Sequence, residues 1–153
     1  MPPPRYRIEI ADRQKCMAVD RQVVRAVVRT VLDSEGVPAA ALSIAIVDDA
    51  TIAEVHARFL GRHQPTDVIT FPFHDPGQGP VEAEIVISAE TACREARGRR
   101  VSPLRELALY LVHGLLHLCG YDDHDEQERK RMRSRERHYL RQLAPLLARD
   151  ATR

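Results

Sequence analysis

The chain has 153 residues, of which 44% are hydrophobic and 29% are charged, and its formal net charge is +1. This length and composition suit one compact globular domain with a core of its own, which we expect over residues 1–153, with the core at about 6–147. The nearly neutral balance excludes a protein that attracts polyanions through its overall charge.

The pattern of apolar residues predicts strands and helices in the order β-α-β-α-β-β-α-α-α. Strands are predicted at residues 6–10, 41–47, 67–73 and 82–88, where apolar residues alternate with polar ones or form short β-branched runs. Helices are predicted at 19–32, 49–60, 89–97 and 126–147, and a further helix is opened by Ser102 and Pro103 and stopped by Gly120. We expect an α+β fold in which a central, mixed, mostly parallel four-stranded sheet is packed with about five helices.

The segment 113–124, with the sequence HGLLHLCGYDDH, predicts a metal site. His113 and His117 are four residues apart on the predicted helix, so both imidazoles project from one face and can reach one ion. Gly120 ends the helix because glycine readily adopts the left-handed cap conformation, and the returning chain can offer His124. Three protein ligands leave one coordination position open, as in catalytic zinc sites. We therefore predict one Zn²⁺ held by His113, His117 and His124.

Neighbouring residues refine this prediction. Asp122 and Asp123 could accept hydrogen bonds that orient a ligand imidazole, although Asp122 could instead cap the last helix or the turn. The histidine pair is metzincin-like, but metalloproteases carry His-Glu-x-x-His, in which the glutamate activates the metal-bound water. Gly114 stands at that position and cannot accept a proton, which argues against peptidase chemistry. No catalytic residue beyond the metal centre is identified.

Two groups of basic residues stand out against the near-neutral total. One is the segment 129–141, and the other consists of Arg94, Arg97, Arg99, Arg100 and Arg105. Such patches can bind phosphate groups on a protein without net positive charge. A solvated helix surface is the competing interpretation, and the sequence leaves both open.

The spacing of the cysteines indicates a reducing compartment, and the absence of long apolar runs argues against a membrane span. Cys16, Cys93 and Cys119 are widely spaced and form no CxxC pair, so we expect no disulfide partner. Cys119 points away from the predicted metal-binding face and is expected in the core. No stretch approaches the roughly 20 apolar residues of a membrane span, and the N-terminus lacks the apolar core of a signal peptide. We expect a cytoplasmic protein without membrane contact.

Three segments carry a specific resemblance to a known family. They are GRHQPTDVITFP at 61–72, EIVIS at 84–88 and HGLLHLCGYD at 113–122. With Met132 and Glu136 on the last helix, they resemble the YbeY family of bacterial metal-dependent endoribonucleases. The resemblance implies a four-stranded α+β fold, a cleft holding a His₃ metal site and cleavage of single-stranded RNA. It also implies maturation of the 16S ribosomal RNA 3′ end and a role in ribosome quality control.

The chain departs from the family pattern at two positions. The usual spacing of the third histidine falls on Asp123, and His124 comes one residue later. We predict His124 as the ligand, because a turn after Gly120 can absorb one extra residue, with Asp123 as the alternative. Leu60 stands where many members have an arginine thought to meet RNA phosphate, and Arg58 or Arg62 are the possible substitutes.

Together these observations predict a metal-dependent, single-strand-specific endoribonuclease that acts on ribosomal RNA. The ribosome or its small subunit would be its partner. One alternative is a non-enzymatic ribosome-assembly factor with a structural metal. The other is a zinc hydrolase of another class, such as a peptidase.

Overall fold

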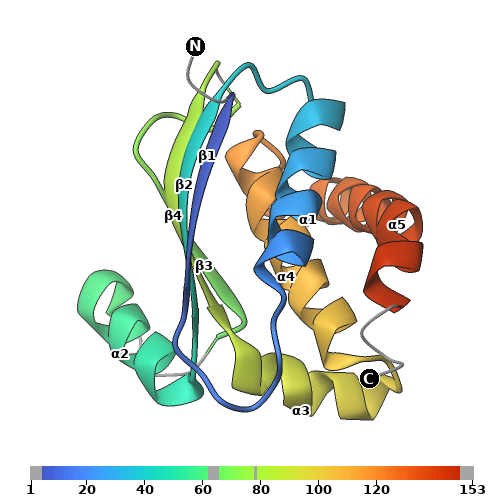
Figure 1. The fold of residues 1–153 in the computed structure, drawn as a ribbon. Helices are drawn as coiled ribbons and strands as arrows, with labels where there is room; N and C mark the ends of the chain where they lie inside the picture. Colours follow the sequence, from blue (N-terminus) through green and yellow to red (C-terminus); the bar gives the residue numbers. More distant parts are fainter. Residues whose placement is uncertain (1–4, 62–65, 78, 149–153) are drawn as a thin grey trace.

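The computed structural model describes residues 5–61, 66–77 and 79–148, and these residues form the predicted elements in the predicted order (Figure 1). The strands are β1 (Tyr6–Asp12), β2 (Ala40–Val47), β3 (Val68–Pro72) and β4 (Val81–Ser88). The helices are α1 (Arg21–Ser34), α2 (Asp49–Leu60), α3 (Ala89–Arg99), α4 (Pro103–Leu118) and α5 (Glu126–Ala148). The predicted fold class, a four-stranded mixed sheet with five helices, is confirmed.

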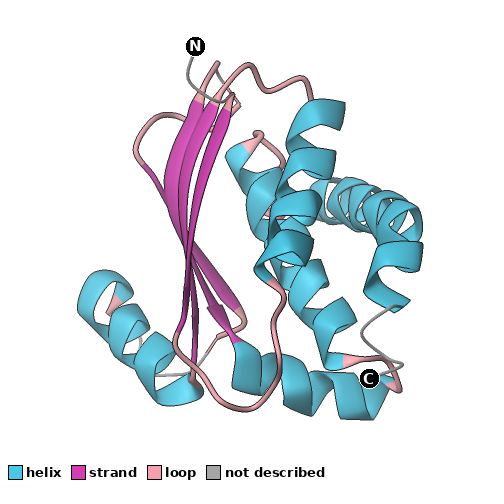
Figure 2. Cartoon of the chain, viewed as in Figure 1, coloured by secondary structure: helices cyan, strands magenta, loops and turns pink. Residues whose placement is uncertain are grey.

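The sheet has the strand order β1-β2-β4-β3. Strands β1, β2 and β4 run parallel, whereas β3 runs antiparallel to β4. Parallel neighbours need a crossover between them, and α1 and α2 provide connections of this kind. Helices α1, α4 and α5 lie on one side of the sheet, and α2 lies on the other side (Figure 2). Strand β3 is therefore an edge strand of a sheet that carries most of its helices on one face.

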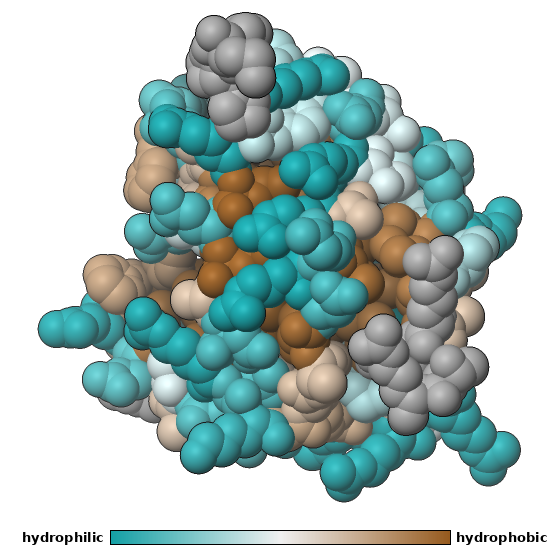
Figure 3. All heavy atoms as spheres, viewed as in Figure 1, coloured by the Kyte–Doolittle hydropathy of each residue, from teal (hydrophilic) through white to brown (hydrophobic). Residues whose placement is uncertain are grey.

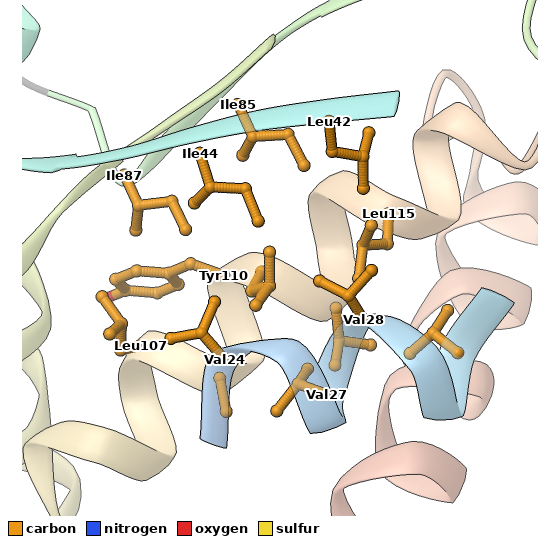
Figure 4. Close-up of a cluster of buried hydrophobic side chains, with 14 of the residues drawn as sticks. Val24, Val27, Val28, Leu42, Ile44, Ile85, Ile87, Leu107, Tyr110 and Leu115 are labelled. Carbon is orange, nitrogen blue, oxygen red and sulfur yellow. The ribbon is translucent and has the colours of Figure 1, made fainter. Parts of the chain in front are cut away.

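The main core lies between the sheet and the pair α1 and α4. Alternate residues of β2 and β4 point toward these helices and meet apolar side chains from both (Figure 4). The buried set includes Leu42, Ile44, Ile85 and Ile87 from the sheet, Val24, Val27 and Val28 from α1, and Leu107, Tyr110 and Leu115 from α4. Each large apolar side chain removed from water contributes about 1.5–3 kcal/mol. This burial fixes the rotation of α4 about its axis and hence the direction of its histidines.

Side-chain caps define where four of the helices begin. Each capping side chain accepts a hydrogen bond from a backbone N–H in the first turn, at 2.8–3.1 Å. The capping residues are Asp20 for α1, Asp48 for α2, Ser88 for α3 and Ser102 for α4. Such a cap stabilises a helix by about 1 kcal/mol, so these local signals explain why the predicted helix starts agree with the structure.

Polar and charged side chains cover most of the face seen in Figure 3, and apolar residues show only in patches between them. Among the described residues, the large apolar side chains that are well exposed are Phe59, Leu60 and Phe73. No described helix combines the length and apolar character needed to cross a membrane.

Gly114 allows α4 to approach β3 closely. A Cβ atom at this position would lie 3.0 Å from Cγ2 of Thr70 and 3.4 Å from Cγ2 of Val68. A side chain at this position would fit only if these methyl groups gave way by a few tenths of an ångström. The position that holds the catalytic glutamate in metalloproteases is thus occupied here by a packing contact.

Replacing Gly114 by valine should lower the free energy of unfolding by about 1–3 kcal/mol, because the branched side chain overfills the contact with β3. Urea denaturation would measure the loss. Adding Thr70→Ser, which removes the methyl group nearest to the new side chain, should restore part of it. A Gly114→Val variant as stable as the wild type would contradict this close packing.

Candidate metal centre

Two histidine side chains project from α4 into a cleft beside β3. His113 and His117 lie one helical turn apart, and their Nε2 atoms are 3.1 Å from each other. Their neighbours on α4 are buried, whereas the two histidine side chains are 29% and 26% exposed. The helix therefore presents two imidazole nitrogens together at the surface of the cleft, as the sequence predicts.

Asp123 supplies a third atom to this group. Its Oδ2 lies 3.5 Å from Nε2 of His117 and 3.8 Å from Nε2 of His113. A tetrahedral ion with bonds of about 2.0–2.1 Å needs donor atoms roughly 3.4 Å apart. The three atoms thus stand at the spacing that a single ion of this size requires, and the donor set of two imidazoles and a carboxylate is one that Zn²⁺ accepts.

The structure does not bring His124 to the other two histidines. Nε2 of His124 lies 3.1 Å from Oδ1 of Asp122, and the His124 side chain is 79% exposed. Residues 122–124 are exposed, half-buried and exposed in turn, as in an extended chain whose successive side chains point to opposite sides. Asp123 therefore faces the histidine pair, whereas Asp122 and His124 pair with each other and do not belong to the group formed by His113, His117 and Asp123. Asp122, Asp123 and His124 form a second, more exposed set of possible ligands.

The end of α4 fixes which residue faces the pair. The N–H groups of Gly120 and Tyr121 donate to the carbonyls of His117 and Leu116, both at 3.0 Å, which are the two bonds of a Schellman motif. Gly120 has φ +100° and packs against Gly77, so that a Cβ on Gly120 would lie 3.1 Å from Cα of Gly77. With the chain held up to residue 121, no extra residue is absorbed in the turn, and the position two residues later, Asp123, reaches the pair.

A carboxylate outside the motif holds the same segment from the side of α1. Glu35 accepts hydrogen bonds from Oη of Tyr121 at 2.9 Å, from Nη2 of Arg135 at 2.8 Å and from Oη of Tyr139. The Glu35 side chain is only 10% exposed. Burial opposes its ionisation, but the three donors outweigh burial and hold the pKa of Glu35 below its ordinary value. Glu35 thereby ties α1, α5 and the segment carrying Asp123 to one another.

Glu136 on α5 orients His113. Its Oε2 lies 2.5 Å from Nδ1 of His113, which leaves Nε2 of His113 directed at the other two donors. Burial alone would lower the pKa of His113, but the hydrogen bond and negative charge of Glu136 outweigh burial and raise this pKa. A carboxylate on the far nitrogen of a ligand histidine is a common feature of metal sites. Sequence analysis assigns Glu136 only a place in the family resemblance and assigns Glu35 no role, because contacts across 23 and 86 residues leave no local pattern.

His113 and His117 line a cleft of about 500 Å³ between α4, β3 and the end of α2, and Asp122 lines it beside them. His56 and Leu60 contribute from α2, and Thr66 and Asp67 precede β3. Oδ1 of Asp67 accepts the N–H of Val68 at 2.7 Å, a local bond that fits a structural role at the start of the strand. None of the described residues that line the cleft is a lysine or an arginine.

Arg58 and Arg62 are the predicted substitutes for an arginine at position 60. Arg58 is exposed on α2 and does not line the cleft. Arg62 lies outside the described residues. Leu60 itself, 51% exposed, places an apolar side chain at the cleft.

The cysteines are not among the candidate ligands of the described residues. Cys119 packs against the main core, and burial raises the pKa of its thiol to about 12, which disfavours the thiolate that a metal needs. Cys16 and Cys93 are free thiols with Sγ atoms 3.4 Å apart.

Removing the hydroxyl of Tyr121 should weaken metal binding, whereas removing that of Tyr139 should not. Tyr121→Phe and Tyr139→Phe each delete one donor to Glu35 and should each lower the free energy of unfolding by about 1–2 kcal/mol. Only Tyr121 is linked by the chain to Asp123, so only Tyr121→Phe should lower the affinity for Co²⁺ severalfold in a titration followed by absorption. Equal Co²⁺ affinities in the two variants would limit Glu35 to a role in stability.

Comparisons with known proteins identify the family of this chain. A model of the family described as endoribonuclease YbeY matches residues 9–144. The endoribonucleases YbeY of Syntrophotalea carbinolica and Carboxydothermus hydrogenoformans are 37% and 36% identical to this chain. These alignments cover 84% and 88% of this chain and 90% and 96% of the relatives.

The fold has a counterpart among solved structures. The solution structure of TM1509 from Thermotoga maritima matches with a TM-score of 0.67 over 97% of this chain and 95% of that chain, at 20% sequence identity. This likeness concerns the fold alone, whereas the family match and the identities above concern the sequence. On these grounds, the chain belongs to the endoribonuclease YbeY family.

Proposed function

We propose that this protein is a metal-dependent endoribonuclease of ribosomal RNA processing whose ion is held by His113, His117 and Asp123. Membership of the endoribonuclease YbeY family makes it a hydrolase that acts on RNA. The observation that carries the metal centre is the convergence of two imidazole nitrogens and one carboxylate oxygen at 3.1–3.8 Å. The two histidines line a cleft of about 500 Å³, within the usual range of about 300–1,000 Å³ for binding pockets.

The residues around the site have separate tasks. A bound ion would supply a Lewis acid for the phosphoryl oxygen and lower the pKa of a bound water toward 7. Glu136 holds the His113 ring and keeps its proton on Nδ1, away from the cleft. Glu35, through Tyr121, holds the segment that presents Asp123. Gly114 offers no base, which disfavours the peptidase alternative.

Access to the site favours catalysis over a purely structural ion. A structural zinc is normally enclosed by four protein ligands. Here the three donor side chains are 26–42% exposed, so solvent or substrate can reach the donors. This accessibility counts against the assembly-factor alternative.

Zinc is our proposal for the ion, with Asp123 in place of His124 as its third ligand. Nitrogen and carboxylate donors at tetrahedral spacing suit Zn²⁺, and three ligands leave one position for substrate or water. His124 would need residues 121–124 to change conformation before its ring could replace Asp123.

Asp123→Ala should lower Zn²⁺ affinity by more than about tenfold, since even the loss of a residue that only orients a ligand typically costs about 10–100-fold. His124→Ala should change it less than twofold. Competition with a chromophoric chelator would measure both variants. The opposite ranking would restore the set of three histidines as the ligands.

His117→Ala should abolish cleavage of an RNA fragment that contains the 3′ end of 16S ribosomal RNA, because it removes one of three ligands. Wild type and variant, prepared identically, would be compared by gel with and without added Zn²⁺. Equal cleavage by both would reveal a contaminating nuclease and remove the support for the activity. Tight RNA binding with no cleavage by either would favour the assembly factor.

The finer assignments are also proposals. They are single-stranded regions near the 16S 3′ end as substrate, the ribosome or its small subunit as partner, and the cytoplasm as location. They are supported by the resemblance of segments 61–72, 84–88 and 113–122. We also propose that residues 1–153 form one domain, in keeping with a main core that α1, α3, α4, α5 and the sheet share.

A further inference from the structure

We propose that a row of arginines on α5 is the surface on which the phosphate backbone of single-stranded RNA docks beside the metal cleft. The row consists of Arg129, Arg133, Arg137 and Arg141 and is called the arginine row below. The inference rests on the proposed function, which supplies the RNA substrate, and it adds the place where that substrate is held.

Helix geometry lines these residues up. They occur at every fourth position of α5, so each lies about one turn beyond the last, and all four are exposed. From 129 to 141 the helix rises by roughly 18 Å, at about 1.5 Å per residue. The apolar residues of α5, such as Met132, are buried in the core. The row is therefore a narrow, polar line of cations rather than one face of an amphipathic helix for a lipid surface.

The row starts at the metal-binding segment. Nη1 of Arg129 donates to the backbone carbonyls of Asp123 and His124 at 3.3 and 3.4 Å. Glu136, which contacts His113, follows Arg129 by seven residues, or two turns, and so lies on the same side of α5 as Arg129. The row turns round the helix by about 40° per step, so a strand that follows it from the far end would wind round α5 and reach the metal-binding segment at Arg129.

Charge on the row is only partly neutralised. Glu126 lies 3.4 Å from Arg129 and 3.9 Å from Arg133, with all three side chains about half exposed or more. Among the described residues, no carboxylate forms an ion pair with Arg137 or Arg141. Most carboxylates near the row, Asp122, Asp123, Asp125, Glu126 and Glu128, lie at its metal end, and Glu136, farther along α5, contacts His113. The far end, Arg137 and Arg141, is the part most available to an anion.

The described residues that line the cleft offer no side chain with a fixed positive charge. They include no lysine or arginine but do include Asp67 and Asp122, and Leu60 adds an apolar side chain. Binding of nucleic acid depends largely on cations that neutralise phosphates. A line of cations that begins at the metal-binding segment can neutralise phosphates in this way. Because the cations follow one another along the helix, they suit the backbone of a single strand.

The other basic group offers a matched control. Arg94 is held by Asp49 at 2.9 Å and Arg99 by Glu106 at 3.4 Å. Arg97 and Arg105 of that group are exposed and have no ion pair among the described residues. Arg97→Gln/Arg105→Gln therefore removes the same charge as Arg137→Gln/Arg141→Gln from a different part of the surface.

Binding of a short fluorescent single-stranded RNA would be measured by anisotropy at several KCl concentrations for the wild type and both double variants. Arg137→Gln/Arg141→Gln should weaken binding about tenfold at low salt. It should also flatten the slope of log K against log salt by about 1.4, because each phosphate contact to a single strand contributes about 0.7. The control should lose less than twofold. Co²⁺ affinity and thermal stability should be unchanged in both variants.

Equal losses in the two double variants would overturn the proposal in favour of a general charge effect, and wild-type binding by the row variant would overturn it outright. If polyglutamate displaced the RNA at equal charge concentration and also required the row, an acidic protein would be the better partner. RNA binding that depends on the row in a wild-type protein that cleaves nothing would support the docking surface and remove the proposed nuclease activity.

Discussion

The burial of α4 against the sheet is the constraint on which the rest of the site depends. Nearly every side of this helix is covered, by the sheet, by α1 and by α5, and Gly114 brings its backbone against β3. A polar ring inside such packing is costly unless its nitrogens find partners. His113 and His117 escape this cost because their Nε2 atoms open on the cleft and because Nδ1 of His113 meets Glu136. The packing that stabilises the fold thus also aims the two imidazoles.

The third donor depends on contacts that converge from distant parts of the chain. Gly77 and Gly120 pack backbone against backbone on one side of the segment, and Tyr121 reaches Glu35 on the other. Glu35 also binds Arg135, so α5 is joined to the same point. In a partly buried setting such hydrogen bonds are stronger than in water and reinforce one another. A segment held in this way presents Asp123 with little freedom, which lowers the entropy cost of closing a metal site.

The sequence predicts most of the fold and two of the three donors, because those features are local. Apolar periodicity and capping residues locate the strands and helices, and a spacing of four places His113 beside His117. The third donor is different. Which residue becomes the third donor depends on the backbone conformation after Gly120. The Schellman hydrogen bonds and the contact with Gly77, which lies more than forty residues earlier, determine that conformation. The prediction of His124 depends on a turn after Gly120 that absorbs one extra residue, whereas the extended backbone turns Asp123 toward the pair. The contacts of Glu35 and Glu136 are likewise products of tertiary structure.

Separating the cations from the reacting centre has a consequence for catalysis. Interactions that bind substrate and transition state equally improve affinity without accelerating the chemical step. In the proposed arrangement, the arginine row contacts phosphates that do not react, and the ion held by His113, His117 and Asp123 is the main positive charge at the phosphate that does. Its charge matters most there because negative charge develops on the phosphoryl oxygens during cleavage. A cleft lined by Leu60, Thr66 and Gly114 adds little binding energy of its own, so the chemistry would depend on the ion and the affinity on the helix beside it.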